Sequence, residues 1–396
     1  MILNYLGRAT LGISFLLILS TNINAQVVQP GTTTNGSQSN NIVTAVPFLL
    51  ITPDARAGAM GETGVAIAPD ANTMSINPSK LAFLDKPYGF SVSYSPWLKS
   101  LVPDINLAYL SGFYKLDDRT TIGSSLRYFS LGQIQLTDAA QTDLGTYSPN
   151  ELAFDVTYAR RFGDEFSLGT AARFIYSNLT SGQFSAGQET KAGTALAVDV
   201  SAYYKKPTIF FGKDAIISAG LNLSNIGTKM SYVEGGNKYF LPTNMKLGGA
   251  TTLIIDDYNQ FTLALDFNKL MVPTQPIRDT NGNIISGSDP DRSVPAGIFG
   301  SFGDAPGGFS EELKEVSISA GAEYWYNQQF ALRAGYFYEA PEKGDRRYFT
   351  LGAGLKYNVF NIDFAYLLAD AQKSPLANTL RFSLLFNFGA TTATNK

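Results

Sequence analysis

The 396 residues carry a net charge of only −3, so the chain lacks the positive charge that nucleic-acid binding requires. It contains no cysteine and no histidine, which excludes disulfides, thiolate nucleophiles and imidazole bases and removes the commonest zinc ligands. We therefore expect no enzyme, no catalytic residue, no metal site, no cofactor and no nucleic-acid partner.

Residues 1–25 have the three parts of a secretory signal peptide. Arg8 lies near the start, an apolar run extends from Leu11 to Leu19, and Ile23-Asn24-Ala25 is a plausible cleavage site. The apolar run is too short to cross a bilayer as a helix. Residues 26–41 are rich in Gly, Thr, Ser and Asn without periodicity, which predicts a flexible periplasmic leader. A docking segment is the alternative for this stretch.

Residues 42–86 differ from the rest of the chain because they are rich in glycine and do not alternate. An irregular backbone of this kind would leave polar groups unpaired in lipid, whereas inside a barrel it would find partners. This segment is therefore the predicted plug, or hatch, of the barrel lumen. Its candidate site residues are Arg56, Gly58, Gly61, Gly64, Asp70, Asn77 and Pro78.

From residue 87 onward, apolar and polar residues alternate in segments of about ten, the length of a tilted strand that crosses a bilayer. In the last segment, Leu380, Phe382, Leu384, Phe386 and Phe388 occupy every second position. We predict an all-β fold, with residues 87–396 forming an antiparallel transmembrane β-barrel of about 14 strands. A β-sandwich or a soluble barrel is the alternative. The predicted strands are Tyr88–Tyr94, Ile105–Tyr114, Thr121–Leu131, Leu152–Phe162, Phe166–Tyr176, Gly193–Tyr204, Ala215–Asn225, Thr243–Leu253, Phe261–Phe267, Val316–Tyr326, Phe330–Tyr338, Tyr348–Tyr357, Val359–Leu368 and Thr379–Phe388.

Long and short connections alternate along the predicted strands. The long ones are residues 132–150, 177–192, 226–242 and 268–315, and the short ones include 163–165, 327–329 and Asn358. The connection 205–214 breaks the rule because it is longer than the other short ones. Aromatic residues flank the short turns, as membrane-interface girdles do. We expect the long loops to be extracellular and both termini to be periplasmic.

The plug carries a resemblance to known families. The run from Arg56 to Gly64, with Asp70-Ala71-Asn72 and Asn77-Pro78-Ser79-Lys80-Leu81-Ala82, resembles the hatch of the long-chain fatty acid transporter (FadL-like) family. That family usually has Asn-Pro-Ala, so Ser79 is a small-for-small departure. The phrases Leu50–Gly58 and Met60–Gly64 resemble more closely the PorV family of the type IX secretion system of Bacteroidetes.

The second resemblance implies an outer-membrane protein that works with partners. It implies binding to a large translocon barrel, receipt of secreted cargo through the cargo's C-terminal signal domain, and delivery to a surface attachment complex with a sortase-like protease. The first resemblance implies the alternative, an outer-membrane channel for fatty acids or other hydrophobic compounds. In either case outer-membrane lipid surrounds the barrel.

Charged residues fall mostly on the polar face of the strands, and we expect them to pair within the lumen or with the plug because a charge facing lipid is costly. They are Arg127, Arg173, Asp199, Asp266, Glu323, Arg333, Lys356, Asp363 and Arg381.

The longest loop, residues 268–315, holds two further candidate features. Asn281-Gly282 predicts a tight hairpin. The alternative is a calcium loop built from Asp279, Asn281, Asn283, Asp289 and Asp291, although their spacing is not that of an EF-hand. Ile298, Phe299 and Phe302 form a predicted partner-binding surface, since apolar loop residues need cover. A lid folded over the barrel mouth is the alternative.

Overall fold

The computed structural model describes residues 40–97, 104–137, 142–180, 184–185, 188–279, 281–369 and 378–389. The predicted signal peptide, nearly all of the predicted leader and most of the C-terminal tail lie outside the described residues. Among the residues described, no helix is long and apolar enough to span a membrane.

Fourteen strands form one closed barrel in which each strand pairs antiparallel with its neighbour. This confirms the predicted fold class and strand number. The wall closes where the first strand pairs with the last, with Tyr88 opposite Phe388 and Tyr94 opposite Phe382. The wall strands are β1 Tyr88–Pro96, β2 Ile105–Lys115, β3 Thr120–Leu131, β6 Asn150–Phe162, β7 Phe166–Asn178, β10 Gly193–Phe210, β11 Lys213–Gly227, β12 Asn244–Ile254, β13 Asn259–Leu270, β16 Val316–Tyr326, β17 Phe330–Tyr338, β18 Arg347–Tyr357, β19 Phe360–Leu368 and β20 Leu380–Phe388.

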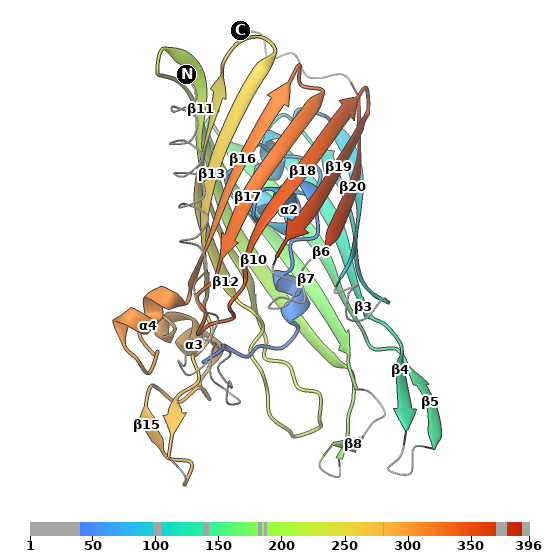
Figure 1. Cartoon of the computed structure of the whole chain (residues 1–396), viewed down its shortest axis with the longest axis vertical. Helices are drawn as coiled ribbons and strands as arrows, with labels where there is room; N and C mark the ends of the chain where they lie inside the picture. The colour runs from blue at the N-terminus through green and yellow to red at the C-terminus, as the bar shows by residue number, and fades with distance from the viewer. Residues whose placement is uncertain are drawn as a thin grey trace, which may run out of the picture. The chain divides into compact units, whose positions relative to one another are not determined.

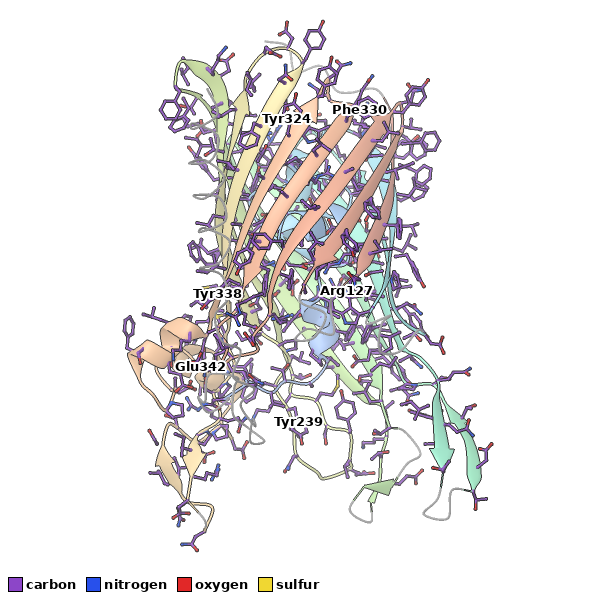
Figure 2. All side chains as sticks on the ribbon, viewed as in Figure 1. Arg127, Tyr239, Tyr324, Phe330, Tyr338 and Glu342 are labelled. Atoms are coloured by element: carbon purple, nitrogen blue, oxygen red, sulfur yellow. The ribbon has the colours of Figure 1, made fainter. Side chains whose placement is uncertain are left out.

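Period-two alternation separates the two faces of this wall. In β7, Leu168 and Phe174 are exposed on the outer face, whereas Ser167 and Arg173, which directly precede them, are buried on the inner face. The same arrangement recurs along most of the wall. Figure 2 shows Tyr324 and Phe330 at the end of the barrel with the short turns and Tyr338 close to the opposite end of the wall.

The predicted loop between Gly193–Tyr204 and Ala215–Asn225 is wrong. β10 and β11 instead continue through Phe210 and Lys213 to a two-residue turn at Phe211 and Gly212, both with positive φ. Cross-strand pairing continues to Phe210 although Lys205 and Lys206 interrupt the apolar alternation, which is why the sequence pattern ended the strand too early.

The long connections carry small elements of their own, all at one end of the barrel (Figure 1). They are the hairpins β4 Ile134–Thr137 with β5 Asp143–Tyr147, β8 Phe184–Ser185 with β9 Gln188–Glu189, and β14 Ile277–Arg278 with β15 Ile284–Ser286, followed by the helices α3 Val294–Gly300 and α4 Phe309–Lys314. The last hairpin confirms the Asn-Gly prediction, since Gly282 has a φ of +87°. The carboxylate of Asp279 there accepts the backbone N–H groups of Asn281 and Asn283.

Residues 40–87 precede the first strand and contain four short helices: η1 Pro47–Leu50, α2 Ala55–Ala59, η2 Thr73–Ser75 and η3 Pro78–Phe83. We call these residues the inner segment. Most of its residues are buried, and in Figure 1 α2 is seen within the barrel. Its polar groups bond to inward-facing side chains of the wall, as described next.

Candidate functional site

Small residues let the inner segment approach the wall closely. Asp54 caps α2 by accepting the N–H of Ala57, and the N–H of Ala55 donates to Ser383 of β20 at 2.9 Å. Gly61 has a φ of +67°, and a Cβ there would lie 2.5 Å from the backbone nitrogen of Tyr336. A side chain at Gly61 would therefore be strained and would also push the segment away from β17.

A buried ion network joins α2 to the wall. The guanidinium of Arg56 donates to both carboxylate oxygens of Glu323, at 2.9 and 2.8 Å, and to Asp70 at 3.0 Å. Glu323 also accepts from Arg333 at 2.7 Å, and Arg333 pairs with Asp363 at 2.6 Å. Because all of these groups except the partly buried Asp70 are almost fully buried, their charges depend on their partners for solvation.

Further contacts hold the middle of the inner segment. The carboxylate of Asp266 on β13 accepts the N–H groups of Gly64 and Val65, at 2.8 and 3.0 Å. Glu62 pairs with Arg381 at 2.8 Å. A Cβ on Gly58 would contact the guanidinium of Arg381 at 2.5 Å.

The start of η3 is fixed by the Asn-Pro dipeptide. Asn77 caps the helix by accepting the N–H of Ser79, and Pro78 occupies its first turn. The amide of Asn77 also donates to the carbonyl of Val65 at 2.8 Å. The N–H of Ser79 donates to the hydroxyl of Ser201 in the wall, and the carbonyl of Ser79 accepts from the hydroxyl of Ser167. All seven candidate plug residues therefore lie on the segment that contacts the wall.

A second ion cluster lies nearer the long loops. Arg173 pairs with Asp155 at 2.5 Å and with Asp199 at 3.1 Å, and Arg127 donates to the carbonyl of Leu49 at 2.7 Å. Asp155 was missed by the sequence interpretation, although it has the inward parity of Glu151 and Thr157 on the same strand. Contrary to the expectation of a paired interior charge, Lys356 is exposed at the short-turn end.

The inner segment lies between two cavities. One, of about 140 Å³, faces the long loops and is lined both by polar side chains such as Glu62 and Arg381 and by apolar ones such as Leu49 and Trp97. The other, of about 420 Å³, lies on the short-turn side and is lined in part by Arg56 and Lys356. Within the described residues, no group of three or more acidic side chains is arranged to hold a metal ion.

At the long-loop end, α3, the turn that follows it and α4 present exposed apolar side chains. Phe299 is 80% exposed, Phe309 is 77% exposed and Phe302 is 48% exposed, whereas Ile298 is half-buried. The backbone of α3 is held in place because Gly297 packs directly on the ring of Phe240. Phe299 therefore does not fold back as a lid.

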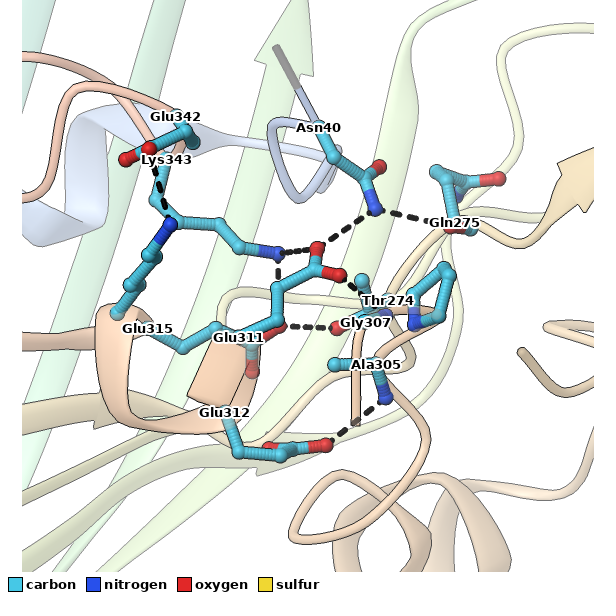
Figure 3. A network of polar contacts seen from close by, with 12 residues as sticks. Asn40, Thr274, Gln275, Ala305, Gly307, Glu311, Glu312, Glu315, Glu342 and Lys343 are labelled. Carbon is cyan, nitrogen blue, oxygen red and sulfur yellow. Dashed lines mark hydrogen bonds and ion pairs between the residues drawn. The ribbon is translucent and has the colours of Figure 1, made fainter. Parts of the chain in front are cut away.

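A charged network holds α4 against the barrel mouth (Figure 3). Lys343 pairs with Glu311 at 2.6 Å and with Glu315 at 3.0 Å, while Lys269 at the end of β13 pairs with Glu312 at 3.0 Å and with Glu315 at 2.6 Å. Burial acts to raise the pKa of Glu311, but Lys343 and the N–H of Gly307 outweigh it and leave that pKa lowered. The sequence pattern predicted no site role for any residue of this network. Glu315 marked only the end of the predicted loop 268–315.

Asn40 connects this network to the inner segment. Its side-chain amide donates to Glu311 at 3.0 Å and to the carbonyl of Gln275 at 3.2 Å. Because Asn40 is the first described residue of the inner segment, the same group of contacts fixes both α4 and the start of that segment (Figure 3).

The chain was compared with known structures and sequences. The toluene transporter TodX of P. putida superimposes with a TM-score of 0.51 at 13% identity, over 86% of this chain and 99% of that one. A TodX mutant described as a monoaromatic hydrocarbon channel gives a TM-score of 0.51 at 14% identity, over 85% and 99% of the two chains. At these identities the likeness concerns the fold alone. The comparison with curated proteins gives no match.

A family model described as "Type IX secretion system protein PorV" matches residues 34–277. This match covers more than half of the chain, and it spans the inner segment and the wall from β1 to β13. It agrees with the resemblance seen in the phrases around Arg56 and Gly61. The chain therefore belongs to the PorV family of outer-membrane proteins of the type IX secretion system.

Proposed function

We propose that this protein is the cargo carrier of its secretion system. It binds the large translocon barrel in the outer membrane, receives secreted cargo through the cargo's C-terminal signal domain, and delivers it to the attachment complex with a sortase-like protease. Membership of the PorV family supports a role within this system. The steps themselves, and the partners named, are our proposal.

The proposed contact with the translocon rests on one observation: the apolar side chains of α3 and α4 are exposed, while the backbone that carries them is held in place by packing and ion pairs. Phe299 and Phe309 are at least three-quarters exposed, while Gly297 and the ion network around Lys343 fix the backbone beneath them. Exposed aromatic side chains on a fixed backbone lose little freedom on binding, so they suit the anchor positions of a protein interface.

We also propose the orientation of the barrel. The long loops face the cell exterior, and the short turns and both termini face the periplasm, as in bacterial barrels whose periplasmic turns are short. In this orientation α3 and α4 face cargo that has crossed the membrane.

We further propose that the inner segment acts as a plug. The networks of Arg56 and Glu62 fasten it to β16 and β20, and it separates the two interior cavities. A sealed lumen suits a carrier, because cargo then binds at the long-loop end and does not pass through this barrel.

The test is a pull-down with Phe299→Ser and Phe302→Ser combined. We expect co-purification with the translocon barrel to be lost, because the anchors are replaced by small polar side chains, while the barrel keeps its heat-modifiable migration on gels. Phe211→Ser is the matched control, since Phe211 is 87% exposed at the short-turn end. If the double variant still brings down the translocon, the proposed contact surface is wrong.

The second candidate function is a channel for fatty acids or other hydrophobic compounds, which the superposition on a toluene transporter favours. Against it, the interior between the two cavities is filled with paired charges, a poor path for an apolar molecule. Uptake of a labelled hydrocarbon into vesicles containing the purified protein would support the channel. No uptake, together with bound cargo in the pull-down, would support the carrier. Neither role includes a catalytic step, so we propose that the protein is not an enzyme.

A further inference from the structure

The outward face of the wall contains an apolar groove of about 670 Å³. It lies near the long-loop end of β6, β7, β10 and β11, and Val294 at the start of α3 closes one side. Almost all of its lining surface is carbon. The groove is lined by Phe154, Phe174, Leu196, Val198, Ile226 and Val294, among others.

A bulge in β11 shapes one side of the groove. Val198 is paired with Ile226 and Val200 with Leu223, so two residues of β11 oppose Asp199 alone. The bulged residue, Asn225, has a φ of +59°, and its N–H donates to the carboxylate of Asp199 at 2.8 Å. Bulges bend the strand that carries them, which turns the end of β11 away from a regular wall.

Small residues form the floor. Ala172 faces outward between Val156 of β6 and Val198 of β10, while the larger Phe174 and Leu196 stand one pair further toward the loops. At the far side Gly227 allows close approach, because a Cβ there would lie 2.2 Å from the carbonyl oxygen of Leu196. The wall is thus hollowed by small side chains and bordered by large ones.

The polar groups beneath the groove are satisfied from within. Arg173 bonds to Asp155, Asp199 and Asn225 on the inner face. They offer no partner to a polar ligand in the groove. Besides Arg173, the only polar side chain among the described residues that line the groove is that of Thr228, whose hydroxyl accepts the N–H of Leu196 at 3.4 Å, so an occupant is recognised mainly by apolar contact.

We propose that this groove binds an acyl chain of a membrane lipid. The barrel belongs to an outer-membrane family, so lipid chains contact its outward apolar wall, and the groove continues that wall with an almost entirely apolar lining. A chain seated against Leu196 and Val198 also contacts Val294. The lipid then supports the first turn of α3, the helix that carries Phe299. This inference needs only the membrane location, so it stands or falls separately from the cargo-carrier proposal.

The test places a large side chain at the floor of the groove. We would purify the protein in mild detergent and measure retained lipid by native mass spectrometry for wild type, Ala172→Phe and Ala334→Phe. Ala334 is the matched control because it also faces outward, between Ala322 and Leu351, and does not line the groove. We expect wild type and Ala334→Phe to retain lipid alike. Retention by Ala172→Phe should fall by about tenfold, the effect of displacing about two methylene groups.

A second variant separates loss of lipid binding from a folding defect of Ala172→Phe. Leu196→Asn adds no bulk but places an amide in the apolar border, so it should also lower lipid retention while the barrel keeps its heat-modifiable migration. Equal lipid retention by all four proteins, or no retained lipid in wild type, would overturn the proposal. If wild type retains no lipid and Ala172→Phe loses the translocon in pull-downs, the groove is a protein contact and the lipid assignment is wrong.

Discussion

Removing the Arg56 side chain is the most direct test of how the inner segment is held. In Arg56→Met, the buried carboxylate of Glu323 and the partly buried carboxylate of Asp70 lose the three hydrogen bonds that they now accept from this guanidinium. Losing one member of a buried ion pair costs about 3 to 5 kcal/mol. Glu323 keeps Arg333 at 2.7 Å, and Asp70 keeps the N–H of Asn72 at 2.8 Å. We therefore expect the lower value, about 3 kcal/mol.

Such a loss should raise the population with a detached inner segment on the order of 100-fold. Trypsin cleavage after Lys80 measures this population, because Lys80 is 2% exposed and is reached only when the segment opens. Single-channel recording in planar bilayers gives an independent readout, since detachment of the proposed plug should open the lumen. Both cleavage and conductance should rise in Arg56→Met.

Two controls make the reasoning refutable. Arg160→Met removes an exposed arginine from the wall and should change neither readout. Arg56→Met combined with Glu323→Gln removes both charges and should restore part of the protection, because the buried carboxylate that lost Arg56 is gone and Arg333 keeps Asp363. If Arg56→Met is cleaved after Lys80 no faster than wild type, the ion network does not hold the segment.

Three further outcomes are expected. Gly61→Ala should lower the temperature at which the barrel loses its heat-modifiable gel migration, since a Cβ would meet the backbone of β17. Gly163→Ala, at a similar positive φ with open space around it, should have a much smaller effect. The lowered pKa of Glu311 means that its pairing with Lys343 stabilises α4 above the ordinary carboxyl pKa of 4.5 and is lost as pH falls through the lower folded value. Hydrogen exchange in α4 should therefore be constant from neutral pH to about 5 and rise in acid once intrinsic rates are removed; a rise beginning near pH 7 would contradict this. Arg173→Met should destabilise the barrel by about 3 to 5 kcal/mol in denaturant titrations, and an unchanged midpoint would show that its two carboxylates are solvated by other means.

The strands of the wall can be predicted from the sequence because the alternation of apolar and polar residues in each strand reflects its two different faces. Phe382, Leu384 and Phe386 alternate with Arg381 and Ser383, so both the strand and its two faces follow from local pattern. The same signal failed at the turn of β10 and β11, where Lys205 and Lys206 interrupt the alternation although pairing continues to Phe210. Cross-strand hydrogen bonds there extend the hairpin beyond its apolar part.

The contacts of the inner segment could be predicted only in part from the sequence. Its glycines and its Asn-Pro dipeptide are local features, so the need for close approach and a helix start could be predicted. That Arg56 meets Glu323, and that Gly64 meets Asp266, depends on which strand faces each part of the segment. Those pairs are more than 200 residues apart in the chain.

By itself, the sequence determined the alternation that makes a two-faced wall, the number of strands and the position of the glycine-rich segment, because each depends on neighbours within a few residues. Only the tertiary structure decided which buried charges pair, which loop aromatics stay exposed, and where the bulge at Asn225 hollows the outer face. Those outcomes depend on the closure and register of the whole barrel, which bring distant residues to one place.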